Sequence, residues 1–270
     1  MIVAFEGWND AGDAATAAVE QLTESWNALH WSDISPEKYV DFQVSRPRTR
    51  VDEEGNRRID WPVTSISYCT PPGADFDVVL LRGVEPNYRW LSFCQAVLKA
   101  ARTLRVTRII SLGALLADVP HTRPVQVTAT AADDRARLRF DLPLSTYEGP
   151  TGITGVLTSM SADEDIATAS LWAAVPHYVS AGPSPKATLA LLHRLEELLD
   201  VEVPLGTLPD EADSWESEVS QIAADDDEIT NYIHALEERD EQEEPLEPTS
   251  GDSIAADFER YLRRRGPGGR

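Results

Sequence analysis

Cysteine is scarce in this chain of 270 residues, which contains Cys69 and Cys94 and no other. Both thiols lie in apolar stretches, so we expect them to be reduced and buried, as in a cytoplasmic protein. Histidine is also sparse, with five scattered residues. Because structural zinc sites need closely spaced Cys and His, we expect no metal site, and no motif calls for a cofactor.

Long apolar runs and clustered basic residues are missing too. No stretch of eighteen apolar residues occurs, and no basic segment precedes an apolar one near the start. We therefore expect no membrane span and no secretory signal. The formal net charge is −22. Because binding to phosphate backbones needs clustered Lys and Arg, we expect no nucleic-acid partner.

Familiar catalytic motifs are absent as well. The sequence has no G-x-S-x-G and no H-E-x-x-H. Gly7 and Gly12 have the separation found in a phosphate-binding Walker A loop. However, Asp13 and Ala14 stand where that motif has Lys followed by Ser or Thr. Motifs alone therefore assign no reaction.

The first 200 residues alternate between short apolar runs and amphipathic segments. Strands are expected at residues 2–5, 39–44, 65–69, 78–81, 108–112, 126–129 and 170–174, and helices at 13–29, 87–104 and 185–199. Short runs that are apolar throughout are typical of strands buried on both faces. The sequence predicts an α/β fold, with helices on both faces of a mostly parallel sheet.

Residues 44–63 interrupt this alternation. Two polar, extended arms flank a turn at residues 52–56, a pattern that predicts a β-hairpin outside the core. Two interpretations stay open. The hairpin is either simply solvated or an oligomer contact, because Val51, Ile59 and Trp61 would otherwise expose apolar area to water.

The negative charge is concentrated near the C-terminus. Residues 200–247 contain eighteen acids and one base, whereas the rest of the chain has 28 acids and 23 bases. Acidic helices are expected at 210–223 and 226–238, a disordered linker at 241–250, and an amphipathic helix at 251–265. We divide the chain into a core at 1–200, an acidic helical extension at 201–240, and a linker with a short helix at 241–270.

The loop after the first expected strand carries the first candidate site residues, Trp8, Asn9, Asp10 and Asp13. Ligands of open α/β sheets collect at the carboxyl ends of strands. One interpretation therefore places Trp8 and one aspartate in a cleft. The other makes Asp10 the N-cap of the next helix, with Asp13 favoured by the helix dipole.

Three later loops also carry polar side chains next to expected strands or helices. Their candidate site residues are Asp118, His121, Thr122 and Arg123, then Gly149, Thr151 and Gly152, then His177 and Tyr178. A histidine beside an aspartate and an arginine suits general acid–base work, and an ordinary solvated loop is the alternative. The threonine either only caps a helix or turns the first helical amides toward a ligand.

Four segments carry a resemblance to a known family: FEGWNDAGDAAT, GALLADVPHTRP, EGPTGITG and SLWAAVPHY, in this order. Over about residues 1–200 the chain resembles actinobacterial members of the proteasome assembly chaperone 2 family. The resemblance implies a three-layer α/β/α sandwich of the purine nucleoside phosphorylase type. It also implies a homotrimer with the hairpin at the subunit contact, and a C-terminal helical lid over a cleft at the strand ends.

The resemblance extends to function. Archaeal and eukaryotic relatives bind proteasome α-subunits, so proteasome subunits or another protein are the expected partners. Many such relatives end in a hydrophobic residue, Tyr and any residue. This sequence ends in RGPGGR, so we expect no docking through a tail of that kind.

Two functions remain open at this level. The first is a protein-binding module, which fits the acidic extension and the missing catalytic motifs. The second is a small-molecule-binding protein or a hydrolase- or phosphorylase-like enzyme, which uses polar residues gathered at the strand ends. A pocket lined by three or more of the four loops would favour the second function, and a plugged strand end would favour the first.

Overall fold

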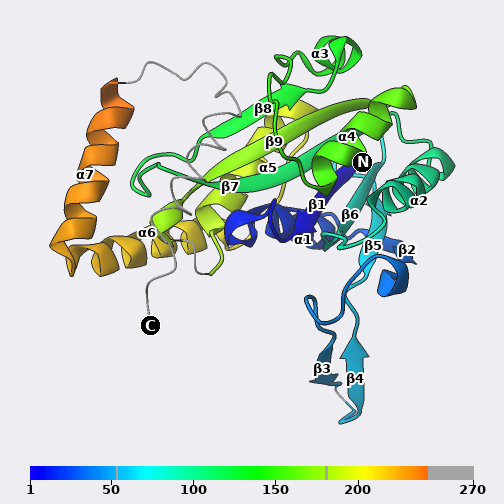
Figure 1. Ribbon diagram of the computed structural model, residues 1–270, viewed down its shortest axis with the longest axis horizontal. Coiled ribbons are helices and arrows are strands. Elements are labelled where there is room, and N and C mark those ends of the chain that lie inside the picture. Colours follow the sequence, from blue (N-terminus) through cyan, green and yellow to red (C-terminus); the bar gives the residue numbers. More distant parts are fainter. Residues whose placement is uncertain (53, 180–181, 243–270) are drawn as a thin grey trace.

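The computed structural model describes residues 1–52, 54–179 and 182–242. Residues 243–250 of the expected linker and the whole of the expected helix at 251–265 lie outside these ranges. The described chain forms a central sheet with helices on both faces, and a separate two-stranded hairpin (Figure 1).

The central sheet has seven strands in the order β2-β5-β6-β1-β7-β9-β8. Their bounds are β1 Ile2–Glu6, β2 Leu29–Ile34, β5 Thr64–Cys69, β6 Val78–Val84, β7 Arg108–Ala117, β8 Val127–Ala131 and β9 Ala167–Pro176. Strands β6, β1, β7 and β9 are parallel to one another. The outer strands β5 and β8 run antiparallel to their inner neighbours, and β2 runs antiparallel to β5. The sheet is therefore parallel at its centre and antiparallel toward both edges.

Helices cover both faces of this sheet. The helices α1 (Ala14–Ser25), α3 (Asp134–Phe140) and α5 (Pro185–Leu199) contribute to one core, and α2 (Trp90–Thr103) and α4 (Ile153–Asp163) contribute to the other.

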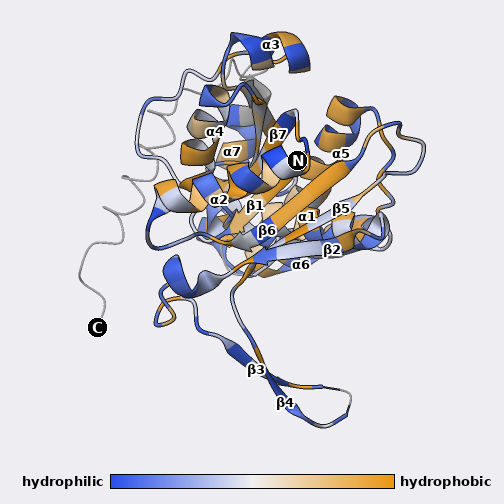
Figure 2. Ribbon diagram, turned by 90° about the vertical axis from the view of Figure 1, so that its right-hand side faces the viewer, coloured by the Kyte–Doolittle hydropathy of each residue, from blue (hydrophilic) through white to orange (hydrophobic). Residues whose placement is uncertain are grey.

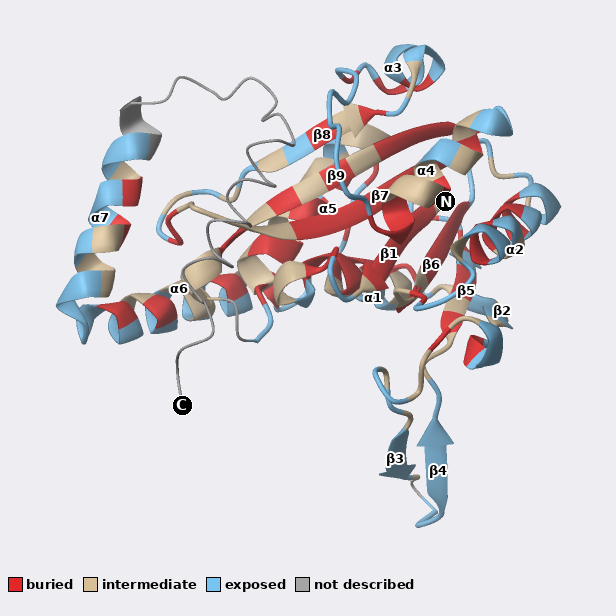
Figure 3. Cartoon of the chain, in the orientation of Figure 1, coloured by how far each residue is buried: buried red, intermediate tan, exposed pale blue. Residues whose placement is uncertain are grey.

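Strand β1 shows how the sequence produces the two cores. Ile2 and Ala4 belong to the first core, and Val3 and Phe5 belong to the second. Successive strand side chains point to opposite faces, so a strand that is apolar throughout is buried on both sides. Figure 3 shows this burial along the central strands. The predicted three-layer α/β/α sandwich is confirmed.

One predicted strand was wrong, and one strand was missed. Residues 39–44 form turns after a short 3₁₀ helix, η2 (Pro36–Lys38), because the amides of Tyr39 and Val40 both bond to the Pro36 carbonyl. The strand in this region is instead β2, which follows directly after the turn that ends α1. It was missed because it is an edge strand with polar, mostly exposed residues.

Other predicted elements agree more closely. The helix expected at 185–199 is α5, and the helix expected at 87–104 is α2, which begins three residues later. The acidic helices are α6 (Leu208–Ala224) and α7 (Asp227–Gln242), so residues 241–242 continue a helix. Helix α6 packs against α5, and α7 packs against α6.

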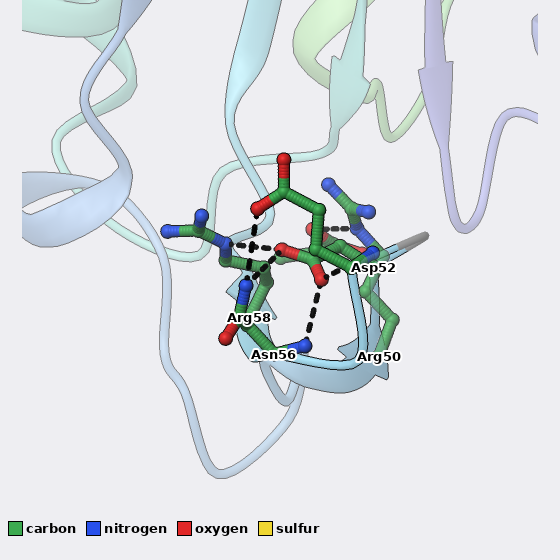
Figure 4. A network of polar contacts seen from close by, with 6 residues as sticks. Arg50, Asp52, Asn56 and Arg58 are labelled. Carbon is green, nitrogen blue, oxygen red and sulfur yellow. Dashed lines mark hydrogen bonds and ion pairs between the residues drawn. The ribbon is translucent and has the colours of Figure 1, made fainter.

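The predicted hairpin is present and stands clear of the body in two views (Figures 1 and 2). Its strands are β3 (Arg48–Val51) and β4 (Arg57–Asp60). Asp52 shapes the turn, because its Oδ1 accepts from the amides of Glu54 (3.2 Å) and Asn56 (2.7 Å). Its Oδ2 pairs with Arg58 at 2.9 Å (Figure 4). The turn is therefore defined by side-chain bonds of the hairpin itself.

Candidate functional site

The carboxyl ends of β7 and β9 bring two of the candidate loops together. The two strands pair in register for ten residues, from Arg108 with Ala167 to Ala117 with Pro176. Residues 118–123 and 177–178 therefore leave the sheet side by side. Side chains of α6 and α7 bond to the first of these loops.

His121 connects the two loops to α6. Its backbone amide donates to the Tyr178 hydroxyl oxygen at 2.7 Å, and its Nδ1 lies 2.9 Å from the same oxygen. Its Nε2 lies 2.9 Å from Oγ of Ser220 on α6. In the tautomer in which the Tyr178 hydroxyl donates its hydrogen to Nδ1, the imidazole proton lies on Nε2 and faces Ser220.

The environment of His121 favours the neutral ring. The side chain is 2% exposed, and burial lowers its pKa, an effect that Lys186 reinforces and that Glu216 and Glu237 oppose. Burial also raises the pKa of Tyr178 to about 12. At neutral pH the His121 and Tyr178 side chains are therefore both uncharged and joined by hydrogen bonds.

Asp118 forms a second link to the C-terminal helices. Its Oδ1 lies 3.0 Å from Nδ1 of His177 and accepts from the hydroxyl of Tyr232 on α7, also at 3.0 Å. Arg239 of α7 donates to the Asp118 carbonyl oxygen. Burial, followed by the Asp118 charge and hydrogen bond, raises the pKa of Tyr232 to about 12. The carboxylate is thus used to hold α7.

Further polar contacts join the loop after β7 to α5, α6 and α7. Lys186 of α5 donates to the His121 carbonyl oxygen at 2.5 Å and pairs with Glu216 of α6. Thr122 donates to Glu237 of α7.

One small cavity lies beside these contacts. A cavity of about 10 Å³ remains beside His121, bordered also by Arg123 and by Trp215 of α6. That volume suits about one water molecule. Polar contacts from α6 and α7 thus close over the loop that follows β7.

Asp10 has a structural role. Its Oδ1 accepts from the amides of Ala15 (2.7 Å) and Thr16 (3.3 Å), and its Oδ2 accepts from the Thr16 hydroxyl. Burial raises its pKa, and these hydrogen bonds oppose the shift. Asp10 therefore bonds to amides of the first turn of α1, but it is not the N-cap residue that one interpretation made it. Asp13 occupies the N-cap position itself with φ 52° and makes no side-chain cap bond.

Asn9 and Gly152 meet at a different place, the N-terminus of α4. The Nδ2 group of Asn9 donates to Oε1 of Glu85 at 2.9 Å, and the Ile153 amide donates to the same oxygen at 2.8 Å. Gly152 is the N-cap of α4, and a Cβ there would overlap the Asn9 amide. The opening loop therefore packs closely against the start of α4.

Glu85 was missed at the sequence level. It follows directly after β6, at the same sheet edge as the loop after β1, and is separated by 76 residues from Asn9. A polar residue directly after a buried strand was the available signal. Ser220 and Tyr232 were missed as well, because no pattern indicated which surface α6 and α7 would cover.

The remaining candidates take less central positions. Trp8 is 55% exposed. Thr151 does not cap α4, and its hydroxyl lies 3.4 Å from the Gly152 carbonyl oxygen. Gly149 lies under Tyr147, whose hydroxyl donates to the Pro150 carbonyl oxygen at 2.5 Å.

The contacts thus group the four loops into two clusters rather than one cleft. The first and third loops meet at Glu85, and the second and fourth meet under α6 and α7. No set of three or more His, Cys, Asp or Glu in the described part of the chain is placed to hold a metal ion. Burial raises the pKa of Cys69 to about 11 and of Cys94 to about 12, so neither thiol is activated.

Among residues 1–52, 54–179 and 182–242, no helix combines the length and apolarity needed to cross a bilayer. The fold and site define an α/β/α protein whose longest strands end under an acidic helix pair. The sequence model of the PAC2 family matches residues 4–223. The chain belongs to the PAC2 family.

Solved structures show the same fold. A PAC2 family protein from Streptomyces avermitilis is 48% identical, with 86% of this chain and 98% of that chain covered and a TM-score of 0.79. A proteasome-assembly chaperone homologue from Mycobacterium tuberculosis is 51% identical, with the same coverage and a TM-score of 0.77.

A more distant structure shares the fold alone. An archaeal proteasome activator from Pyrococcus furiosus is 14% identical, with 82% of this chain and 91% of that chain covered and a TM-score of 0.64. The comparison with curated proteins gave no match.

Proposed function

We propose that this PAC2 family chain is a protein-binding module that acts on proteasome subunits in the manner of an assembly chaperone, in the cytoplasm. The observation that carries the proposal is the closed end of β7 and β9. Three polar side chains there, His121, Asp118 and Thr122, are occupied by bonds to α6 and α7. The adjacent cavity of about 10 Å³ is too small for a metabolite.

The same contacts argue against acid–base chemistry at this site. A general base must reach the proton that it removes from a substrate. His121 is buried and bonds to Tyr178 and Ser220 instead. In this proposal the polar cluster positions a helical lid, formed by α6 and α7, and the exposed surface of the lid faces protein partners.

The proposal includes a homotrimer with the hairpin β3–β4 at the subunit contact. Val51, Ile59 and Trp61 of the hairpin are 65%, 55% and 48% exposed. A hairpin of two short strands is marginally stable alone in water, so a packing partner would account for these side chains. A monomer at all concentrations in sedimentation velocity would refute this part.

A native mass spectrum of the protein, purified gently from its source cells, tests the proposal. A trimer that carries extra mass equal to proteasome α-subunits is the expected result. Ile59→Asp places a charge at the proposed subunit contact, so the trimer mass should be absent from the spectrum of this variant. A trimer without protein partners but with a retained small molecule would contradict the protein-binding function.

A second candidate function, small-molecule binding, is favoured by one observation. The Oδ1 atom of Asn9 is buried and has no hydrogen-bond partner among the described residues. It lies in a side chain that is 1% exposed and that bonds to Glu85. A ligand with a hydrogen-bond donor would satisfy it. The retained mass in the same experiment would identify such a ligand, and Asn9→Ala should abolish its retention.

A further inference from the structure

A groove at the β2 edge of the sheet lies away from both loop clusters. It has a volume of about 400 Å³ and is bordered by β2, the 3₁₀ helix η2 and α2. Strand β2 is the last strand of the sheet on this side (Figure 1). The volume falls within the range that is typical of small-molecule sites. We call this feature the β2–α2 groove.

The groove exists because α2 presents small side chains to the edge of the sheet. Ala96, Ala100 and Thr103 of α2 line it, and their spacing of four and three residues places them on one face of the helix. Alanine side chains are too short to fill the space between α2 and the edge strand. Ile66 of β5 also lines the groove and is 1% exposed, so the bottom of the groove is apolar.

The walls of the groove are apolar and held by the core. Trp31, Ile34 and Tyr39 line it, and the last two also pack against the core on the α2 side of the sheet. The ring of Tyr39 meets the ring of Phe93 edge to face, with centroids 5.4 Å apart. The apolar lining is therefore fixed in place before anything binds to it.

Strand pairing decides which charges face the groove. Ser32 pairs with Ile66, and Asp33 pairs with Ser65. Because directly paired residues share a face and successive residues alternate, Ser32 lies on the groove face with Ile66, and Asp33 lies on the opposite face. On that opposite face its Oδ2 atom lies 3.7 Å from Nε2 of His30. The Asp33 carboxylate is therefore not one of the charges that face the groove.

Two of the three lysines in the chain line this groove, Lys38 from η2 and Lys99 from α2. Neither ammonium group has an ion-pair or hydrogen-bond partner among residues 1–52, 54–179 and 182–242. The third lysine, Lys186, pairs with Glu216. Glu37 is the remaining carboxylate at the groove. The groove face thus carries more positive than negative charge, in a chain whose formal net charge is −22.

We propose that the β2–α2 groove binds a small organic acid, whose carboxylate meets Lys38 and Lys99 and whose apolar chain or ring lies against Tyr39 and Ile66. An ammonium group donates charge-assisted hydrogen bonds to a carboxylate, and an apolar body displaces water from the apolar lining. This site is separate from the proposed protein-binding function, because β5, β6 and β1 lie between β2 and the strands that end under α6 and α7.

Two probes that differ only in their polar group test the recognition. Phenylbutyrate carries a carboxylate and phenylbutanol carries a hydroxyl on the same aryl chain, and ligand-detected NMR titrations measure both. Phenylbutyrate should bind saturably, with a dissociation constant on the order of 1 mM. Phenylbutanol should bind at least about threefold more weakly. Because the ammonium groups are exposed, added salt should reduce this difference.

Three variants locate the site. The double change Lys38→Gln and Lys99→Gln should weaken phenylbutyrate binding about 3- to 10-fold and leave phenylbutanol binding unchanged. Ala96→Trp fills the groove from α2 and should weaken both probes more than about tenfold. Arg135→Gln with Arg194→Gln, on α3 and α5, makes the same charge change away from the groove and should leave both affinities unchanged. Circular dichroism verifies that each variant is folded.

Each contrary outcome overturns the proposal. Phenylbutyrate that shows no saturable binding up to about 10 mM would exclude the site. Equal affinities for the acid and the alcohol, or an unchanged affinity in the folded lysine variant, would show that the carboxylate is not recognised. Binding that persists in folded Ala96→Trp would place the ligand elsewhere. A peptide with a C-terminal phenylalanine that binds where phenylbutyrate does not would assign the groove to a protein partner instead.

Discussion

Lowering the pH should loosen the contact between α6 and the loop that holds His121. The buried ring is neutral, with Nδ1 facing the Tyr178 hydroxyl and Nε2 facing Ser220. A proton on Nδ1 would compete with the hydroxyl hydrogen that occupies that contact. When α6 moves away, His121 becomes exposed and regains its ordinary pKa of about 6.5. Acid therefore favours the open form.

The direction and size of this pH effect on opening follow from the lowered pKa of His121 in the closed form, in which α6 covers the ring. Above pH of about 6.5 neither form binds the proton, and opening does not depend on this group. Below that value the opening equilibrium grows up to about tenfold per pH unit, or about 1.4 kcal/mol, until the pH reaches the closed-form pKa. The carboxylate of Glu237 has a lowered pKa, chiefly because Thr122 donates to it, so it titrates below this window.

Hydrogen exchange of the α6 amides, corrected for intrinsic rates and followed from about pH 8 to about pH 5, measures this opening. His121→Gln should remove most of the extra opening below pH of about 6.5. His193→Gln, at an exposed position of α5, is the matched control and should keep it. Corrected α6 protection that stays constant over the range in the wild-type protein would refute the reasoning.

Three further changes test the structural roles of the opening loop. Asp10→Ala removes the acceptor of the Ala15 and Thr16 amides and should lower the free energy of unfolding by about 1–2 kcal/mol in urea titrations, and an unchanged midpoint would argue against this role. Gly152→Ala should lower the free energy of unfolding by about 1–3 kcal/mol, because the methyl group of the alanine would overlap the Asn9 amide. Adding Asn9→Ala should recover part of that loss, and full additivity of the two changes would exclude the steric cause. Trp8→Ala should leave the circular dichroism spectrum intact and weaken partner binding, whereas an unfolded variant would place Trp8 in the core.

The central strands could be predicted from the sequence because they are buried on both faces. Runs such as Ile2–Glu6 and Val78–Val84 are apolar in nearly every position, and that pattern is typical of the inner strands of a parallel sheet. Strand β2 has the opposite character, since Leu29–Ile34 is polar and mostly exposed. Its pairing with β5, about 30 residues later along the chain, left no local signal.

The candidate site was predictable residue by residue but not in its arrangement. His121, Asp118, His177 and Tyr178 were identified because they follow buried strands. Their partners lie on α6 and α7, and the sequence indicates that these helices are acidic without showing which surface they cover. The division of the loops into two clusters likewise depends on Glu85, whose contacts join segments that are far apart in the sequence.

We propose that this PAC2 family chain binds proteasome subunits rather than transforming a metabolite. The most direct test is sedimentation velocity of the fluorescently labelled protein, titrated with purified proteasome α-subunits from the same source. A faster boundary that saturates with α-subunit concentration, and that Trp8→Ala weakens, is the predicted result. A boundary that stays at the position of the free oligomer over the whole titration would contradict the claim.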